Sequence, residues 1–155
     1  MKKILMALLM AATFSQASAA DVQIRDVFRE MPDSLMPYLS KNNRLDFIDF
    51  LDSGMKAEVK NSLGGTSEMT SIADDSLSIR MSDGLRVDML LMDSVVVMVE
   101  TFTVDSVYGE SRVHYYSVDW KPLAQPCFSE IQAQRIKRLK MQNIVKRDDD
   151  LLNKR

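Results

Sequence analysis

The feature that most constrains the fold is a change in the spacing of apolar residues near residue 76. From there to residue 116, apolar and polar side chains alternate with a period of two, which is the period of a β-strand. Short polar turns at 82–84 and 93–94 separate the runs. Consecutive strands joined by such short links pair as neighbours. The sequence therefore predicts an antiparallel meander of four or five strands.

The individual runs predict strands at 76–81, 85–92, 95–103 and 112–116. The third run, VVVMVETFT, begins with apolar residues at every position, which predicts a central strand covered on both faces. A polar loop through Asp105, Ser106, Gly109 and Glu110 leads to the last strand.

Upstream of this region the apolar spacing is helical. Asp21 is a candidate cap and Pro32 a stop for a short helix with the apolar positions Ile24, Val27, Phe28 and Met31. A proline-bounded link follows, because Pro32 and Pro37 disfavour a helix in the residues before them. We expect Leu35, Tyr38 and Leu39 to pin this link to the core.

A second helix is predicted with Asn43 as its candidate N-cap and with its end or a kink at Gly54, and residues 56–63 continue it or form a third short helix. Asp46, Asp49 and Asp52 lie three residues apart within it. Carboxylates on consecutive helical turns form a solvated stripe, and without a facing ligand they do not build a metal cage.

The stretch NSLGGTSEMT at 61–70 contains two glycines and several hydroxyls, which raises the question of a phosphate-binding loop. Such a loop needs a strand, spaced glycines, a lysine and then a helix. Here the predicted helix comes first and the strands follow, so we interpret the stretch as a corner. Gly64 is expected to take the left-handed conformation that closes the helix, after which Gly65, Thr66 and Ser67 turn the chain.

The C-terminal region begins where Pro122 and Pro126 end the strands. From Ser129 onward it carries eight lysines and arginines with scattered apolar positions, which predicts a loosely attached surface helix ending near residues 148–150. A membrane-surface helix is the alternative, but the segment lacks a wide apolar face.

These elements predict an α+β fold in which two or three N-terminal helices pack on one face of the meander. The domain organisation is a signal peptide at 1–19, a single α+β domain at 20–128 and a basic helix or tail at 129–155. Cys127 is the only cysteine, so no internal disulfide can form, and we expect it to be a small buried hydrophobe.

The first nineteen residues have the layout of a secretory signal peptide: Lys2 and Lys3, an apolar run from Ile4 to Phe14, and a small-residue site before cleavage after Ala19. The run would rise about 16 Å as a helix, short of the roughly 30 Å membrane core, so no integral membrane span is expected. Its removal changes the net charge from −2 to −4, which gives no reason to expect a nucleic-acid partner. We expect a periplasmic or secreted location.

Catalytic patterns are weak. SGMK at 53–56 matches S-x-x-K, with SDG at 82–84 downstream, yet the K-T-G element of penicillin-recognising enzymes is absent. His114 could act as a base if Asp119, Glu110 or Tyr116 approached it, but a polar-face histidine is the simpler interpretation. We therefore assign no catalytic, cofactor-binding or metal-binding residue and expect no cofactor.

Two groups of apolar residues leave alternatives open. The methionines after residue 20 could line a cavity for an apolar ligand or simply fill the core, and core filling is favoured. Trp120, Tyr115, Tyr116 and Tyr108 gather near the end of the meander, where they either fill the join with the helices or form an exposed recognition patch. Tyr108 lies in a polar loop and is the exception.

The combination of PDSLMPYL, NNRLDFIDFLDSGM, LGGTSEMT and YYSVDWKPL resembles a family of small exported proteins from Bacteroidales that carries a domain-of-unknown-function label. The resemblance covers about residues 21–125. It implies a periplasmic or secreted location and supplies no activity or site residue.

The function these features favour is a non-enzymatic periplasmic interaction or ligand-binding module whose partner is an unknown envelope protein or a small apolar ligand. The alternatives are a carrier of an apolar ligand held between sheet and helices, and a small hydrolase using Ser53 or His114. The missing catalytic set favours a non-enzyme without deciding the question.

Overall fold

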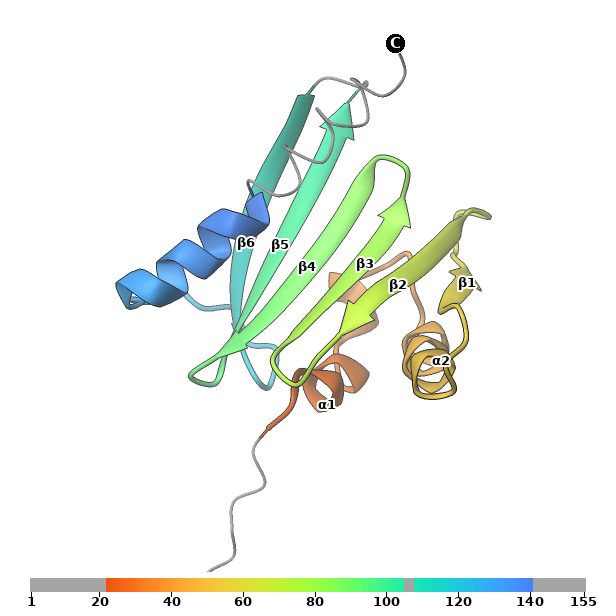
Figure 1. Ribbon diagram of the computed structural model, residues 1–155, viewed down its shortest axis with the longest axis horizontal. Helices are drawn as coiled ribbons and strands as arrows, with labels where there is room; N and C mark the ends of the chain where they lie inside the picture. Colours follow the sequence, from red (N-terminus) through yellow and green to blue (C-terminus); the bar gives the residue numbers. More distant parts are fainter. Residues whose placement is uncertain (1–21, 105–107, 141–155) are drawn as a thin grey trace, which may run out of the picture.

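The computed structural model describes residues 22–104 and 108–140. This part of the chain has an α+β fold built on a six-stranded antiparallel sheet (Figure 1). The strands are β1 (Glu58–Lys60), β2 (Thr66–Ile72), β3 (Ser76–Ser82), β4 (Leu85–Met92), β5 (Val95–Val104) and β6 (Tyr108–Ser117). They lie in sequence order, each antiparallel to the next, so the predicted meander is confirmed.

The sheet has more strands than the four or five predicted, because β1 and β2 were not recognised. Residues 56–63, predicted as helix, contain β1. In β2 the polar Ser67 is fully buried and a bulge interrupts the register between Met69 and Ser71. A buried serine and a bulge break the simple alternation that marks a strand, which explains the error.

Of the stretch 61–70 that was predicted to be a corner, residues 61–65 form one, but it joins β1 to β2 and does not follow a helix. Thr66 and Ser67, which were expected to turn the chain, belong to β2. The Asn61 side chain holds it: its Oδ1 accepts from the backbone N–H groups of Leu63 and Gly65, both at 3.1 Å. Gly64 has the left-handed conformation, with φ of 79°, as expected. The stretch is thus a hairpin loop closed by one asparagine.

The later turns agree with the sequence. Residues 82–84 connect β3 and β4, and Asp93 and Ser94 connect β4 and β5 with positive φ values of 49° and 64°. β6 begins at Tyr108, so Gly109 and Glu110 belong to a strand, whereas Asp105 and Ser106 of the predicted loop lie outside the described residues.

The N-terminal elements are α1 (Ile24–Arg29), the 3-10 helix η1 (Asp33–Leu35) and α2 (Lys41–Asp52). α2 begins three residues earlier than predicted, since its N-cap is Ser40 and not Asn43, which instead completes a capping box with Ser40. Gly54, with φ of 68°, follows its end. Asp21, the predicted cap of α1, lies outside the described residues. No helix in ranges 22–104 and 108–140 is long and apolar enough to cross a membrane.

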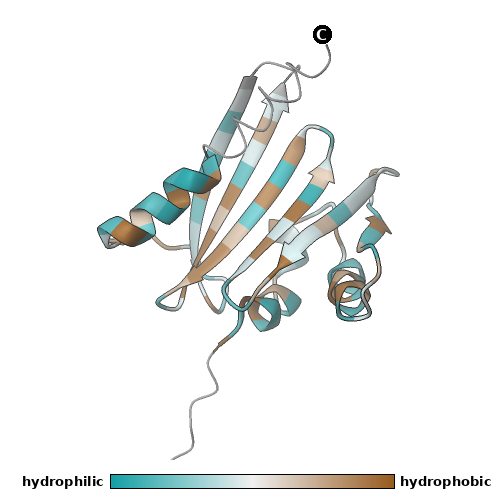
Figure 2. Ribbon diagram, viewed as in Figure 1, coloured by the Kyte–Doolittle hydropathy of each residue, from teal (hydrophilic) through white to brown (hydrophobic). Residues whose placement is uncertain are grey.

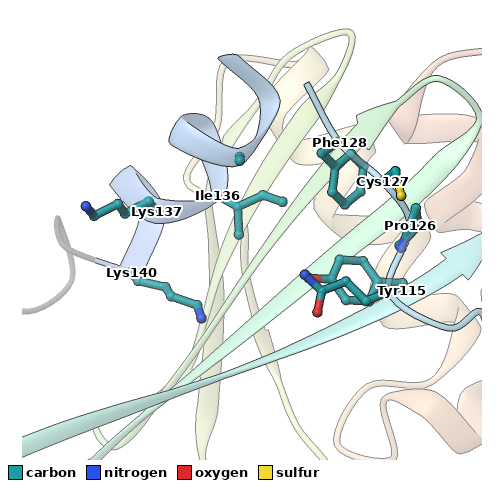
Figure 3. A pocket seen from close by; sticks show the side chains of 9 residues that line it. Tyr115, Pro126, Cys127, Phe128, Ile136, Lys137 and Lys140 are labelled. Carbon is teal, nitrogen blue, oxygen red and sulfur yellow. The ribbon is translucent and has the colours of Figure 1, made fainter. Parts of the chain in front are cut away.

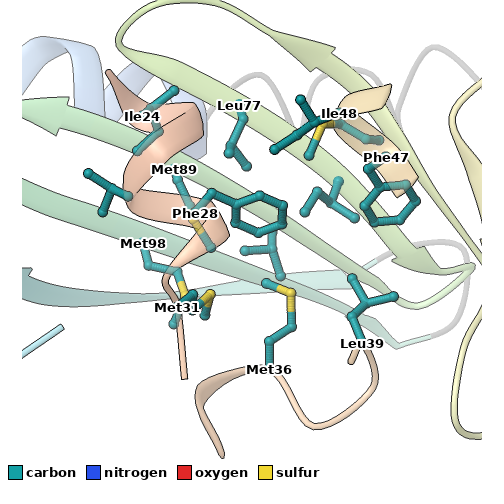
Figure 4. Close-up of a cluster of buried hydrophobic side chains, with 14 of the residues drawn as sticks. Ile24, Phe28, Met31, Met36, Leu39, Phe47, Ile48, Leu77, Met89 and Met98 are labelled. Atoms are coloured by element: carbon teal, nitrogen blue, oxygen red, sulfur yellow. The ribbon is translucent and has the colours of Figure 1, made fainter. Parts of the chain in front are cut away.

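One face of the sheet, which we call the helical face, packs against α1 and α2. Ile24 and Phe28 of α1 and Phe47 and Ile48 of α2 meet the sheet in one buried cluster (Figure 4). The strand residues of this face that are at most 3% exposed include Leu77, Ile79, Val87, Met89, Val96 and Met98. Hydrophobic and hydrophilic residues alternate along the strands (Figure 2). Because successive side chains point to opposite faces of a sheet, this alternation turns the apolar side chains toward the same face.

The opposite face, which we call the groove face, has its own smaller cluster. Leu90, Met92, Val97 and Val99 are at most 5% exposed and pack with Ile136 of a helical segment at residues 130–140. Ser129 and Gln132 form a capping box at its start, since each side chain accepts from the other's backbone N–H. Ile136 is 8% exposed, so this helix is attached more closely than predicted.

A buried arginine holds the link between α1 and α2. The guanidinium of Arg44 donates to Asp33 Oδ1 at 2.8 Å, to the carbonyl of Leu39 at 3.0 Å and to the carbonyl of Met31. The Arg44 side chain is 1% exposed, whereas that of Asp33 is 62% exposed. One side chain therefore fixes both ends of the proline-bounded link, and Leu39 of that link is 1% exposed, as expected.

A second anchor joins the end of β6 to α1. The indole Nε1 of Trp120 donates to the carbonyl of Val27 at 2.8 Å, and Trp120 is 6% exposed. The residue has φ of 62°, a left-handed conformation that costs a bulky residue of order 1–3 kcal/mol and persists where surrounding contacts hold it. The hydrogen bond and the burial supply those contacts.

We expect Arg44→Met to lower the free energy of unfolding by about 2–4 kcal/mol, because it leaves buried carbonyls without their charged donor. Urea denaturation monitored by circular dichroism measures the change. Arg25→Met is the matched control: the Arg25–Asp52 pair at 3.3 Å is partly exposed on both sides, so its loss should cost no more than about 1 kcal/mol. Equal losses in the two variants would contradict the role given to Arg44.

Candidate functional site

A groove lies between β6 and the helix at 130–140. It has a volume of about 680 Å³, and we call it the helix–sheet groove (Figure 3). Its lining comes from three segments: β6, the loop after it and the helix. The lining residues are Tyr115, Gln125, Pro126, Cys127, Phe128, Ala133, Ile136, Lys137 and Lys140.

The floor of the groove is apolar and aromatic. The rings of Tyr115 and Phe128 are tilted against one another with centroids 5.8 Å apart. Ile136 points from the helix toward this pair (Figure 3). Tyr115 is on the groove face because it pairs with Val97 in the register of β5 and β6. Two aromatic rings and a branched side chain thus present a continuous apolar surface.

Two lysines supply the charge of the groove. Lys140 is half-buried and extends from the helix on the side of the groove that faces Tyr115, whereas Lys137 is exposed and its ammonium points away from the groove (Figure 3). A lysine buries its methylene stem along apolar surface and keeps its ammonium accessible. The groove therefore combines an apolar floor with a cationic mouth.

Polar contacts fix the helix over the sheet on the side away from the groove. Gln132 Nε2 donates to Asp93 Oδ2 at 2.5 Å, and Arg135 pairs with Asp75 at 2.8 Å. Asp93 lies in the turn between β4 and β5, and Asp75 in the turn between β2 and β3. With Ile136 buried between them, these contacts set the height of the helix and hence the width of the groove.

Cys127 lines the groove and is exposed. The expectation of a small buried hydrophobe is therefore wrong. Its neighbour Phe128 packs against the cluster of the groove face instead.

His114 lies on the helical face, away from the groove, because it pairs with Met98 in the register. Its Nε2 is 3.2 Å from Glu100 Oε2, and their side chains are 42% and 23% exposed. None of the three partners that the sequence suggested, Asp119, Glu110 and Tyr116, makes this contact. The ring of Tyr116 stacks beside the imidazole, with ring centroids 6.5 Å apart. Glu100 was missed, although a diagonal neighbour on the adjacent strand is the signal that would have found it.

The environment of Tyr116 is apolar and negatively charged. The residue is 8% exposed and its ring contacts that of Trp120 with centroids 5.6 Å apart. Burial raises the pKa of the Tyr116 phenol, and the negative charge of Glu100 raises it further. Tyr116 and His114 thus belong to one small polar cluster around Glu100.

Ser53 and Lys56 do not form the arrangement that S-x-x-K enzymes use. Ser53 is the exposed C-cap of α2, and Lys56 follows in the connection to β1, so the two do not share a helical turn. A hydrogen bond to Glu58 raises the pKa of Lys56, with the charges of Glu58 and Glu68 acting in the same direction. A lysine base requires a lowered pKa, so this pair is poorly suited to activating a hydroxyl.

The remaining sequence candidates have structural places. Asp46, Asp49 and Asp52 are all exposed on α2, which confirms the solvated stripe. Six methionines pack in the cluster on the helical face: Met31, Met36, Met69, Met81, Met89 and Met98. Over the described ranges, no three acidic, histidine or cysteine side chains come together as a metal site would require.

The aromatic residues near the end of the meander do not form one group. Tyr116 and Trp120 are buried on the helical face, while Tyr115 lies on the groove face. The core interpretation holds for the first two, and Tyr115 is instead the floor of the groove. The side chain of Tyr108 is outside the described part of the chain.

The fold and the groove define a small α+β domain with apolar cores on both faces of one meander. The chain belongs to the family described as Protein of unknown function (DUF3256), which matches residues 15–152. This match extends beyond residues 21–125, on which the sequence resemblance rests. Membership of a domain-of-unknown-function family is confirmed, whereas export and a Bacteroidales source stay predictions.

Among solved structures, the chain is similar to a domain of an uncharacterized protein from Porphyromonas gingivalis W83. The two share 25% sequence identity with a TM-score of 0.54, over 66% of this chain and 57% of that chain. This chain thus spans little more than half the length of the solved one. No curated protein matches it. The similarity supports the fold and carries no activity.

We expect the phenol of Tyr116 to ionise above pH about 10, the ordinary tyrosine value, because burial and Glu100 favour its neutral form. Its contribution to stability is present below that pH and is lost as the pH rises through the higher folded-state pKa. Ultraviolet titration of phenolate absorbance measures it. Tyr116→Phe should remove the late component and Glu100→Gln should move it to lower pH. If Tyr116→Phe instead removed a phenol that ionises at the ordinary tyrosine value and left the late component in place, the assignment would be contradicted.

Proposed function

We propose that the protein is an exported, non-enzymatic ligand-binding module that holds an amphipathic anion in the helix–sheet groove. The observation that carries this proposal is the pairing of an apolar floor with a lysine at the opening. Its location is proposed to be periplasmic or secreted, on the basis of the N-terminal sequence of Lys2 and Lys3, an apolar run and a small-residue site.

The size of the groove supports a small-molecule ligand. Ligand pockets typically have volumes of about 300–1,000 Å³. The groove, at about 680 Å³, lies within this range. Tyr115, Phe128 and Ile136 would contact the apolar part of a ligand, so that its burial supplies most of the affinity.

The charge of the groove selects the polar end of the ligand. The whole chain has a net charge of −2, whereas the groove is lined by two lysines. The groove is therefore more positively charged than the protein as a whole. A carboxylate or phosphate at the end of an apolar body would meet the ammonium of Lys140, and charge-assisted hydrogen bonds of this kind are the stronger ones. A ligand with a neutral or cationic head lacks this interaction.

The separation of the groove from the titratable cluster favours binding over catalysis. His114 and Glu100 lie on the helical face and the groove on the opposite face of the same strands. The sheet therefore separates a ligand in the groove from His114 and Glu100. This arrangement makes the hydrolase alternative, through His114 or Ser53, the weaker one.

The proposal is tested by titrating the protein with a fluorescent long-chain carboxylate and with the neutral amide of the same chain. We expect Lys140→Gln to weaken binding of the carboxylate about five- to tenfold and to leave binding of the amide unchanged. Arg138→Gln is the matched control, since Arg138 is an exposed cation of the same helix that does not line the groove.

A second variant tests the groove itself. Ala133 is exposed at the groove wall, so Ala133→Phe should fill the space and abolish binding of both probes without loss of the fold. Gln134→Phe places the same ring one residue away, outside the groove, and should bind normally. Binding that survives Ala133→Phe, or that ignores Lys140→Gln for both probes, would contradict the proposal and direct the search to envelope protein partners.

A further inference from the structure

β6 is an edge strand, and only part of its free edge is covered. The N–H of Leu123 donates to the carbonyl of Tyr115 at 2.9 Å, and the N–H of Ser117 donates to the carbonyl of Lys121 at 2.9 Å. The segment 121–123 therefore closes the edge at the end of β6. Residues 109–113, nearer its start, have no such cover among the described residues.

The direction of the backbone groups on this edge follows from those two hydrogen bonds. Tyr115 and Ser117 point their backbone groups away from β5, and β6 pairs with β5 in one unbroken register. In an antiparallel strand the N–H and C=O of alternate residues point to the same side. The N–H and C=O of Gly109, Ser111 and Val113 consequently point outward as well.

The exposed side chains beside these groups form a self-complementary pattern. Glu110 and Arg112 lie on the same face of the strand, with side chains 76% and 61% exposed. Within one chain Arg112 Nε is 3.7 Å from Glu110 Oε1. An ion pair between two side chains this exposed is weak. Arg112 lies over the ring of Phe102 at 5.2 Å, which limits the directions its guanidinium takes.

We propose that this edge is an interface at which a second copy of the chain pairs antiparallel through β6, about a two-fold axis at Ser111. Ser111 then exchanges hydrogen bonds with Ser111 of the second copy, and Gly109 does so with Val113 of that copy. All outward groups of these three residues are satisfied, and the two sheets become one.

The two-fold axis also places the charges correctly. Glu110 lies directly opposite Arg112 of the second copy, and Arg112 lies opposite its Glu110, in the non-hydrogen-bonded positions where cross-strand side chains are closest. Edge charges usually prevent such pairing, because like charges meet. Here Glu110 and Arg112 lie on either side of Ser111. In a pair of identical antiparallel strands each charge therefore meets its opposite, which favours the pairing.

The other edge of the sheet does not offer this surface. β1 has three residues, and the side chain of Asn43 on α2 donates to the carbonyl of Lys60 there at 3.4 Å. A second copy is the partner that the charges favour, because the same strand running antiparallel supplies both oppositely charged partners at once. This pairing does not depend on a ligand in the groove.

The experiment uses two charge-reversal variants of the full chain, Glu110→Lys and Arg112→Glu, in sedimentation-velocity ultracentrifugation over a concentration series. We expect the unmodified protein to dimerise and each variant alone to self-associate at least about tenfold more weakly, because like charges now meet at both symmetric positions. Asp49→Lys, a reversal on the exposed stripe of α2, is the control and should dimerise normally.

Mixing the two variants provides the decisive result. In the mixed pair, the lysine introduced at position 110 faces the glutamate introduced at position 112, and Arg112 of the first copy faces Glu110 of the second. We expect dimers to return in the mixture. A monomeric unmodified protein, variants that dimerise as it does, or a mixture of two folded variants that stays monomeric would each overturn the proposal; thermal melts establish that both are folded.

Discussion

β4 and β5 carry apolar side chains on both faces, and this constraint shapes the rest of the molecule. Met89 and Met98 face one way, and Leu90 and Val97 face the other, all of them at most 5% exposed. Fully burying one such side chain contributes about 1.5–3 kcal/mol, so leaving either face open would remove much of the net stability of a small domain. Two separate covers are therefore required, one on each face.

The two covers differ in kind, and that difference produces the groove. On the helical face, α1 and α2 form a wide layer, fixed by Arg44 on the link between them and by Trp120 at the end of β6. On the groove face a single helix at 130–140 covers the strands through Ile136. One helix is narrower than the apolar surface beneath it, so Tyr115 and Phe128 stay accessible beside it.

The sequence predicted the parts of this arrangement that depend on local pattern. β3, β4, β5 and the later part of β6, the turns between β3, β4 and β5, and the cores of α1 and α2 follow from apolar period and turn residues. The start of β6 did not, because Gly109 and Glu110 fit a polar loop. β1 and β2 did not, since a buried Ser67 and a bulge hide their alternation. Arg44 and the groove were also missed, because each depends on partners that approach only in the fold: Asp33 for Arg44, and Tyr115 against Phe128 for the groove.

If the groove beneath the helix is a ligand site, native mass spectrometry of the full chain tests it most directly. The protein would be exported and purified without detergent, and its mass compared under native and denaturing conditions. We expect a small-molecule increment that disappears on denaturation and whose released compound carries an anionic group on an apolar body. A bare chain under native conditions, or an increment from a hydrophilic or cationic compound, would contradict a site for an amphipathic anion.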